Sequence, residues 1–157
     1  MSTELLPAQA EGQLDGKLLT FQIKDTRYGV ELGYVIEIIS IEYITSVPNV
    51  PGYIKGIINL RGKIVPVLDV RLKLGLPEQA YDEKTCIIVV NFNEMQVGLI
   101  VDRVSEVVNV NQSNSYPIPE MSQKAEHQFL KSISQIDSKL ILNLDFDRFF
   151  NDDLPTL

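Results

Sequence analysis

The sequence predicts a mainly β protein built from two small, closed or partly closed β barrels in tandem, with only brief helices. Two observations lead to this prediction. Short runs in which apolar residues dominate or alternate with polar ones recur along the chain, and turn residues separate them at short intervals. The second half of the chain then repeats the order of these runs, which is typical of a duplicated unit.

Composition limits the classes of function. The chain has 157 residues, 45% of them hydrophobic, which is enough for one domain or for two small subdomains that share a core. A net charge of −7 argues against nucleic acid as a partner, since phosphate binding needs a concentrated basic surface. The sequence shows neither a signal peptide nor an apolar stretch long enough to span a bilayer, so we expect a protein that is neither secreted nor inserted in the membrane.

The single cysteine, Cys86, lies within an apolar run and is interpreted as a buried small hydrophobe. It cannot form an internal disulfide, which fits a reducing cytoplasm.

The first half follows a polar stretch, residues 1–16, that we expect to be a flexible tail. Its predicted elements are a strand at Leu18–Ile23, a turn at Asp25-Thr26, a strand at Tyr28–Leu32 and an apolar run at Gly33–Ile41 that holds one acid, Glu37. Pro48 and Pro51 then bracket an irregular connection.

A β-hairpin is predicted at the centre of the first half, with strands at Tyr53–Ile58 and Ile64–Leu68. Its tip is Asn59-Leu60-Arg61-Gly62, in which Gly62 can take the positive φ that a tight turn needs. Arg61 is either a solvated turn residue or a functional one that pairs with Glu37. After the hairpin, Asp69 is expected to cap a short helix, Val70–Leu74, that ends at Gly75.

The second half begins after a loop, residues 77–84. Its predicted elements are a strand at Thr85–Phe92, a turn at Asn93-Glu94, a long apolar run at Gln96–Val110, a polar loop with Pro117 and Pro119, a candidate helix at Ala125–Leu130, a hairpin at Lys131–Leu144 and a helix at Phe146–Phe150. Residues 153–157 are expected to form a C-terminal tail.

The repeat is visible at two offsets. An offset of 69 residues places Tyr28–Ile39 on Val97–Val108, and an offset of 76 residues places Ile57–Leu74 on Ile133–Phe150. The halves, residues 17–76 and 85–152, are therefore expected to form two interleaved β-barrel subdomains of one domain, residues 17–152, with a groove between them. Equivalent positions are Val35 with Val104, Glu37 with Glu106, Gly29 with Gly98, and Arg61 with Asp137.

Residue patterns for catalysis are missing from the sequence. His127 is the only histidine and lies among polar residues, so we interpret it as solvated. There is no Cys/His cluster with zinc spacing and no glycine-rich phosphate loop. The acids Asp145, Asp147, Asp152 and Asp153 are more simply helix-capping and surface residues than metal ligands. We therefore expect a binding protein without cofactor or metal, and the competing class is an enzyme or small-molecule binder that uses the groove.

The chain resembles the CheW family of bacterial chemotaxis coupling proteins over nearly all of residues 17–152. The segments that carry the resemblance are Tyr28-Gly-Val-Glu31, Val35-Ile-Glu-Ile38, PGYIKGIINLRGKIVPVLD at residues 51–69, VGLIVDRVSEV at residues 97–107 and LILNL at residues 140–144. The resemblance implies two SH3-like five-stranded barrels around a shared hydrophobic core. It also implies a non-catalytic cytoplasmic adaptor that couples the cytoplasmic tip of a transmembrane chemoreceptor to the regulatory domain of the histidine kinase CheA, at membrane-associated receptor arrays.

The same resemblance suggests site residues. Those expected on the receptor-binding side are Val35, Glu37, Arg61, Gly98 and Val104, and those expected on the kinase-binding side are Lys55, Gly56 and Ile64. The chain departs from many similar proteins at Ser132–Ser138, where glycines are common, which bears on the geometry of the last hairpin.

Overall fold

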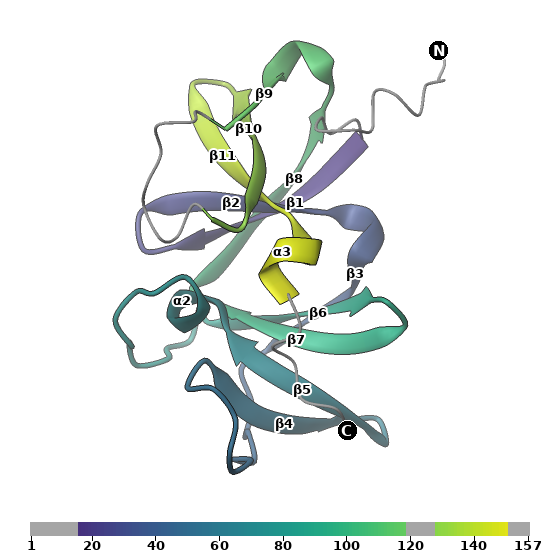
Figure 1. The fold of residues 1–157 in the computed structure, drawn as a ribbon, viewed down its shortest axis with the longest axis vertical. Coiled ribbons are helices and arrows are strands. Elements are labelled where there is room, and N and C mark those ends of the chain that lie inside the picture. Colours follow the sequence, from purple (N-terminus) through teal and green to yellow (C-terminus); the bar gives the residue numbers. More distant parts are fainter. Residues whose placement is uncertain (1–15, 119–127, 151–157) are drawn as a thin grey trace.

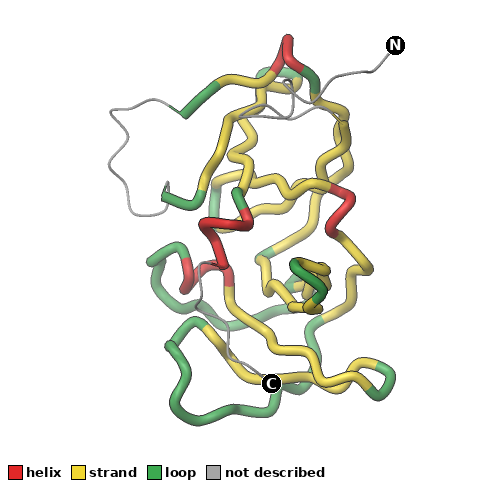
Figure 2. The backbone as a smooth tube through the Cα atoms, turned by 45° about the vertical axis from the view of Figure 1, so that its right-hand side comes forward, coloured by secondary structure: helices red, strands yellow, loops and turns green. Residues whose placement is uncertain are grey.

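The computed structural model describes residues 16–118 and 128–150, most of which lie in strands (Figures 1 and 2). The elements are, in chain order, β1 (Gly16–Ile23), β2 (Thr26–Glu31), the 3-10 helix η1 (Leu32–Tyr34), β3 (Val35–Ser40), β4 (Ile54–Leu60), β5 (Lys63–Asp69), α2 (Val70–Lys73), β6 (Cys86–Phe92), β7 (Met95–Val101), β8 (Arg103–Val110), the 3-10 helix η2 (Gln112–Asn114), β9 (Ser115–Tyr116), β10 (Leu130–Ile136), β11 (Lys139–Leu144) and α3 (Phe146–Phe150).

The strands form two sheets. The six-stranded sheet has the order β8-β1-β2-β11-β10-β9, and the five-stranded sheet has the order β3-β6-β7-β5-β4. Figure 1 shows one sheet above the other with α3 between them. This arrangement confirms the predicted mainly β fold of two subdomains.

Each sheet takes strands from both halves of the repeat. The two offsets match β1 with β6, β2 with β7, β3 with β8, β4 with β10 and β5 with β11. When these equivalents are exchanged, the order of the five-stranded sheet becomes β8-β1-β2-β11-β10, which is the six-stranded sheet without β9. The halves are joined by parallel pairing of β11 with β2 and of β5 with β7. A sequence half is therefore not a barrel by itself.

Four two-residue turns connect the hairpins, and a left-handed backbone at the first turn residue recurs in all four. The turns are Lys24-Asp25, Arg61-Gly62, Asn93-Glu94 and Asp137-Ser138. Positive φ at a hairpin turn matches the right-handed twist of the flanking strands. The prediction for Gly62 is confirmed, with a φ of 88°.

Several predicted boundaries move in the structure. Thr26 is the first residue of β2 and pairs with Ile23, so the first turn lies one residue earlier than expected. Gly16 pairs with Val110 and belongs to β1 rather than to the tail. Leu130 begins β10 instead of ending a helix. The expected tails at residues 1–15 and 153–157, the start of the candidate helix at residues 125–127, and Asp152 lie outside the described residues.

The apolar run predicted at Gln96–Val110 is two strands that belong to different sheets. β7 ends at Val101, β8 begins at Arg103, and Asp102 lies at the crossover between them. Both strands are apolar enough to read as one continuous run, because each has a face buried against the core.

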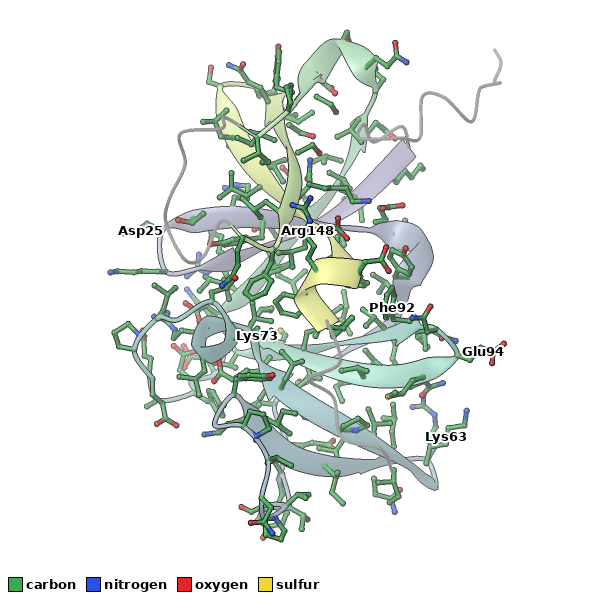
Figure 3. All side chains as sticks on the ribbon, in the orientation of Figure 1. Asp25, Lys63, Lys73, Phe92, Glu94 and Arg148 are labelled. Atoms are coloured by element: carbon green, nitrogen blue, oxygen red, sulfur yellow. The ribbon has the colours of Figure 1, made fainter. Side chains whose placement is uncertain are left out.

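A shared hydrophobic core lies between the sheets and confirms that part of the predicted fold. Its buried members include Phe21 and Tyr28 of the six-stranded sheet, Val90 and Leu99 of the five-stranded sheet, and three phenylalanines of α3. Phe146 packs against Tyr34 with ring centroids 4.8 Å apart, and Phe150 packs against Phe92 at 5.1 Å. Figure 3 shows Phe92 beside α3. The helix thus seals one side of the intersheet interface.

The interior of the six-stranded sheet is partly polar. Asn143 is fully buried, and its Nδ2 donates hydrogen bonds of 3.0 Å to the Oγ atoms of Ser132 and Ser134. Its Oδ1 is the one buried side-chain polar atom without a partner in the described part of the chain. Val67 and Ile58 occupy the positions equivalent to Asn143 and Ser134 in the five-stranded sheet. Ser132 and Ser134, which lie in the segment that departs from the family pattern, therefore bind the side-chain amide of Asn143. The strands β10 and β11 that carry these residues pair as a hairpin.

Candidate interaction site

The predicted pairing of Glu37 with Arg61 is present in the structure. The guanidinium of Arg61 donates to the carboxylate of Glu37 and forms an ion pair with it. Arg61 is the first turn residue of the β4–β5 hairpin and has a φ of 51°. The turn is supported by Gly62, whose N–H donates to Oδ1 of Asn59 at 2.9 Å. Turn geometry thus presents the arginine, and the strand β3 supplies its acid.

The environment of the ion pair is asymmetric. The Arg61 side chain is 69% exposed, whereas that of Glu37 is 25% exposed. The hydrogen bond that Arg61 donates to Glu37 raises the pKa of Arg61, and the Coulombic attraction of the carboxylate adds to this effect. Because the guanidinium is solvated, the pair contributes orientation more than stability.

The ion pair spans a gap between the two edges of the five-stranded sheet. Glu37 lies on the edge strand β3, and Arg61 lies at the end of the opposite edge strand, β4. The same gap is bridged by Thr45, whose backbone N–H and C=O both bond to Ile57 of β4 at 2.9 Å. The chain after β3 therefore partly closes the sheet, and the charged pair adds a second connection.

The second half of the repeat has no counterpart to this pair. Glu106 and Asp137 occupy the positions equivalent to Glu37 and Arg61, so two acids would face each other. The backbone of Glu106 instead bonds to the hydroxyl of Thr20, with the N–H donating at 3.0 Å and the C=O accepting at 2.7 Å. The two halves are alike in fold but different in charge at this site.

Gly56, expected on the kinase-binding side, is buried under the closing segment. Its φ is +145°, and a Cβ atom at this position would lie 1.9 Å from the carbonyl oxygen of Thr45. Only glycine allows the two backbones to approach this closely. Gly56 is therefore required for the closure of the sheet, and its role toward a kinase stays a prediction. Thr45 could not be predicted as the closing residue, because no sequence motif marks it.

The other residues of the predicted receptor-binding side lie in different places. Gly98 is buried on β7, where a Cβ would lie 2.8 Å from Cγ2 of Ile87. Val35 begins β3 and Val104 lies near the start of β8, each partly buried against the shared core. These two strands are edges of different sheets. The structure brings Glu37 and Arg61 together, whereas Val35 and Val104 face the intersheet core, and their contact with a receptor stays a prediction.

The predicted kinase-binding side lies on the β4–β5 hairpin. Nζ of Lys55 lies 2.8 Å from Oε2 of Glu78, and the hydrogen bond from Lys55 lowers the pKa of Glu78. Ile64 is 52% exposed on β5. Its equivalent in the second half, Leu140, is 57% exposed.

Exposed apolar side chains on the edge strands are a feature that sequence analysis missed. Ile36 and Ile38 of β3 are exposed, and so is Val107 of β8, the position equivalent to Ile38. The signal in the sequence was that the segment at Val35–Ile39 is apolar on both faces, although an edge strand can bury only one. Such residues are typical of surfaces that bind proteins.

A polar pocket of about 410 Å³ opens where the two sheets meet. Its lining comes from both sheets and from the loop before β6, and includes Lys24, Asp69, Arg71, Tyr81 and Asp102. No group of three or more His, Cys, Asp or Glu side chains among residues 16–118 and 128–150 is arranged to hold a metal ion. None of the helices in this described part has the length and apolar character needed to cross a bilayer.

Known proteins resemble the chain over most of its length. The CheW-like domain family matches residues 17–154. The chemotaxis protein CheW of Klebsiella aerogenes is 32% identical over 86% of this chain and 81% of its own, and that of Bacillus subtilis is 33% identical over 87% of each. The crystal structure of the scaffolding protein TtCheW from Thermoanaerobacter tengcongensis superposes with a TM-score of 0.77 at 32% identity, covering 84% of this chain and 90% of that one.

Proposed function

The chain belongs to the CheW family of chemotaxis scaffold proteins, and we propose that it is the adaptor that couples chemoreceptors to the histidine kinase CheA. It is not an enzyme. In the proposed role the protein holds the cytoplasmic tip of a receptor and the regulatory domain of the kinase at the same time. The state of the receptor then controls autophosphorylation of the kinase.

One observation supports the two-partner role most directly. Exposed apolar residues recur at equivalent positions of the two sheets, Ile38 with Val107 and Ile64 with Leu140. Exposed aliphatic side chains that gather on one face often mark a protein-binding surface, so their recurrence at equivalent positions supports two similar binding surfaces. The charge difference between Arg61 and Asp137 makes the two surfaces distinguishable to partners.

We assign the receptor to the edge strands β3 and β8, which carry Val35, Glu37 and Val104, together with Arg61, which is paired with Glu37. Gly98 acts through the packing of β7. The kinase is assigned to the β4–β5 hairpin, where Lys55 and Ile64 are accessible and Gly56 maintains the shape of the strand. The Glu37–Arg61 pair belongs to the receptor side and connects it to the kinase side, because Arg61 is a turn residue of the β4–β5 hairpin. Such a protein works in the cytoplasm, at receptor arrays on the membrane.

The proposal is tested by reconstitution. The purified protein is mixed with CheA and with a receptor signalling fragment, and co-sedimentation and kinase autophosphorylation are measured. We expect a ternary complex and a kinase activity that depends on the protein. Absence of binding to both partners would refute the proposal.

A matched pair of variants tests the assignment of the hairpin. Ile64→Ser removes an exposed apolar side chain from the five-stranded sheet, and Leu140→Ser removes its equivalent from the six-stranded sheet. We expect Ile64→Ser to weaken binding of the isolated kinase regulatory domain and Leu140→Ser to leave that binding unchanged. Equal effects of the two substitutions would contradict the assignment.

A further inference from the structure

A charged cluster connects the two sheets at the crossover between β7 and β8. Asp102 lies at this crossover, and its Oδ2 accepts a hydrogen bond of 2.7 Å from the backbone N–H of Lys24 in the β1–β2 turn. The same oxygen accepts a hydrogen bond from the guanidinium of Arg71, which forms an ion pair with Asp102. One carboxylate thus binds the six-stranded sheet through Lys24 and the five-stranded sheet through Arg71, which follows β5 on α2.

Arg71 is held firmly on the side of the five-stranded sheet. Its side chain is 7% exposed, and α2, which carries it, is capped by Asp69 through the N–H of Leu72 at 3.3 Å. The second oxygen of Asp69 accepts a hydrogen bond of 2.8 Å from the hydroxyl of Tyr81. The C=O of Arg71 accepts from the N–H of Leu76 at 3.0 Å. The Arg71 guanidinium that binds Asp102 is therefore fixed in position relative to the five-stranded sheet.

The repeat shows that the fold itself does not require this cluster. The positions equivalent to Asp102, Arg71 and Lys24 are Gly33, Asp147 and Asn93, which cannot form the same contacts. The equivalent side of the intersheet interface is filled instead by the aromatic rings of α3, Tyr34 and Phe92. Figure 3 shows Phe92 on one side of the molecule and Asp25, next to Lys24, on the other.

Packing on the charged side is open. The pocket of about 410 Å³ lies against the pair, with Gln22 and Asp25 of the six-stranded sheet and Ile100 of the five-stranded sheet in its lining. Apolar contact is non-directional and cannot fix an angle where the surfaces do not meet. The ion pair is half-buried, with the Arg71 side chain 7% and the Asp102 side chain 32% exposed, so it contributes little net stability, but its hydrogen bonds impose a definite geometry. The orientation of the sheets on this side must therefore come from the polar contacts.

We infer that Asp102 and Arg71 are positioning residues that set the relative orientation of the two sheets, and hence of the receptor-binding and kinase-binding sides. The last part of this inference rests on the proposed function, whereas the first part concerns the isolated protein. The two parts are tested by separate measurements.

The first measurement is a distance distribution between two spin labels. Asn91→Cys on β6 and Gln135→Cys on β10, both exposed, are labelled in a Cys86→Ala background and measured by pulsed electron resonance. Asp102→Asn keeps an acceptor for Lys24 but leaves Arg71 without a counter-charge. A second variant, Asp102→Asn with Arg71→Met, removes both charges and avoids an unpaired buried cation. The control, Glu31→Gln with Lys131→Met, removes a 2.7 Å ion pair within the six-stranded sheet.

We expect a narrow distribution for the parent and the control, and a broadened or shifted one for the folded Asp102 variants. An unchanged distribution in the double variant, which retains its fold, overturns the inference. If Asp102→Asn does not fold, the double variant alone decides.

The second measurement compares binding of each partner alone with assembly of both. We expect the double variant to bind the receptor fragment and the kinase domain separately, and to lose kinase activation in the ternary mixture. Loss of either separate binding, or normal activation despite altered orientation, overturns the positioning role. If the parent protein binds neither partner, the proposed function fails while the spin-label result still stands.

Discussion

Arg61 at the tip of the β4–β5 hairpin is paired with Glu37 on β3, although three strands of the five-stranded sheet lie between β3 and β4. The pair therefore acts across the opening of a partly closed sheet rather than along neighbouring strands. The exposed ion pair therefore helps to hold the two edges of the sheet together, although it contributes little to the free energy of unfolding.

Replacing Arg61 by alanine is expected to affect assembly more than folding. The guanidinium is solvated, so its loss lowers the melting temperature only slightly. Binding of receptor and kinase should fall by more than this loss of stability accounts for, because one of the two connections across the gap is lost and only the bridge from Thr45 to Ile57 remains. Calorimetry and co-sedimentation measure the two effects.

The reciprocal swap, Glu37→Arg with Arg61→Glu, provides the control for that prediction. It should restore part of the lost assembly, and a double-mutant cycle measures the coupling between the two residues. Unaltered assembly and kinase activation by Arg61→Ala would show that the hairpin tip is only a solvated turn.

Gly56→Ala is expected to destabilise the protein strongly, by about 2 kcal/mol or more, because the new Cβ meets the carbonyl oxygen of Thr45 in a backbone region unfavourable for other residues. Gly62→Ala is the matched control: it also has positive φ, but no atom lies within 4 Å of its added Cβ. Its cost should be about 1–2 kcal/mol, from backbone strain alone. Urea unfolding compares the two, and equal effects would mean that the sheet is not closed by Thr45.

Asn143→Ala is expected to lower the free energy of unfolding by about 1–3 kcal/mol, since the hydroxyls of Ser132 and Ser134 lose their buried partner. A quadruple variant, Ser115→Ala, Ser132→Ala, Ser134→Ala and Asn143→Val, removes every member of this polar group, including the Ser115 hydroxyl 3.5 Å from that of Ser134. It should be more stable than Asn143→Ala, because none of these polar side-chain atoms is left unpaired. A quadruple variant less stable than the single one would show that the network itself supports the six-stranded sheet.

Tyr81 should make the stability depend on pH in the alkaline range. Burial raises the pKa of Tyr81 above its ordinary value of 10.0, and the hydrogen bond to Asp69 adds to this effect. The unfolded chain therefore ionises first, so this stability is fully present below pH 10.0 and is lost as the pH rises further. Tyr81→Phe should lack this dependence while the rest of the alkaline unfolding curve remains. If the stability of both proteins depended on pH in the same way, the Tyr81 hydroxyl would have to be exposed to solvent in the folded protein.

Local elements could be predicted from the sequence because they depend on neighbouring residues. The turn at Arg61-Gly62 needs a positive φ that glycine adopts freely, and the cap at Asp69 needs an acceptor one residue before α2. The helix Phe146–Phe150 has the predicted bounds, since three phenylalanines on a single short turn must be buried. The repeat was also visible, because equivalent positions keep the same apolar pattern.

The tertiary structure alone decided which strands share a sheet and which residues close it. The crossover at Asp102 sends β7 and β8 to different sheets, and no local property of the run at Gln96–Val110 distinguishes this from one long strand. The sequence shows that position 56 is a glycine, but not why. Only the structure shows that the backbone of Thr45, 11 positions earlier, packs so close that no side chain fits at position 56. The alternation of apolar and polar residues along one segment shows which face of that strand is buried. It does not show which other strand the segment pairs with, because strand pairing depends on contacts with residues far away in the sequence.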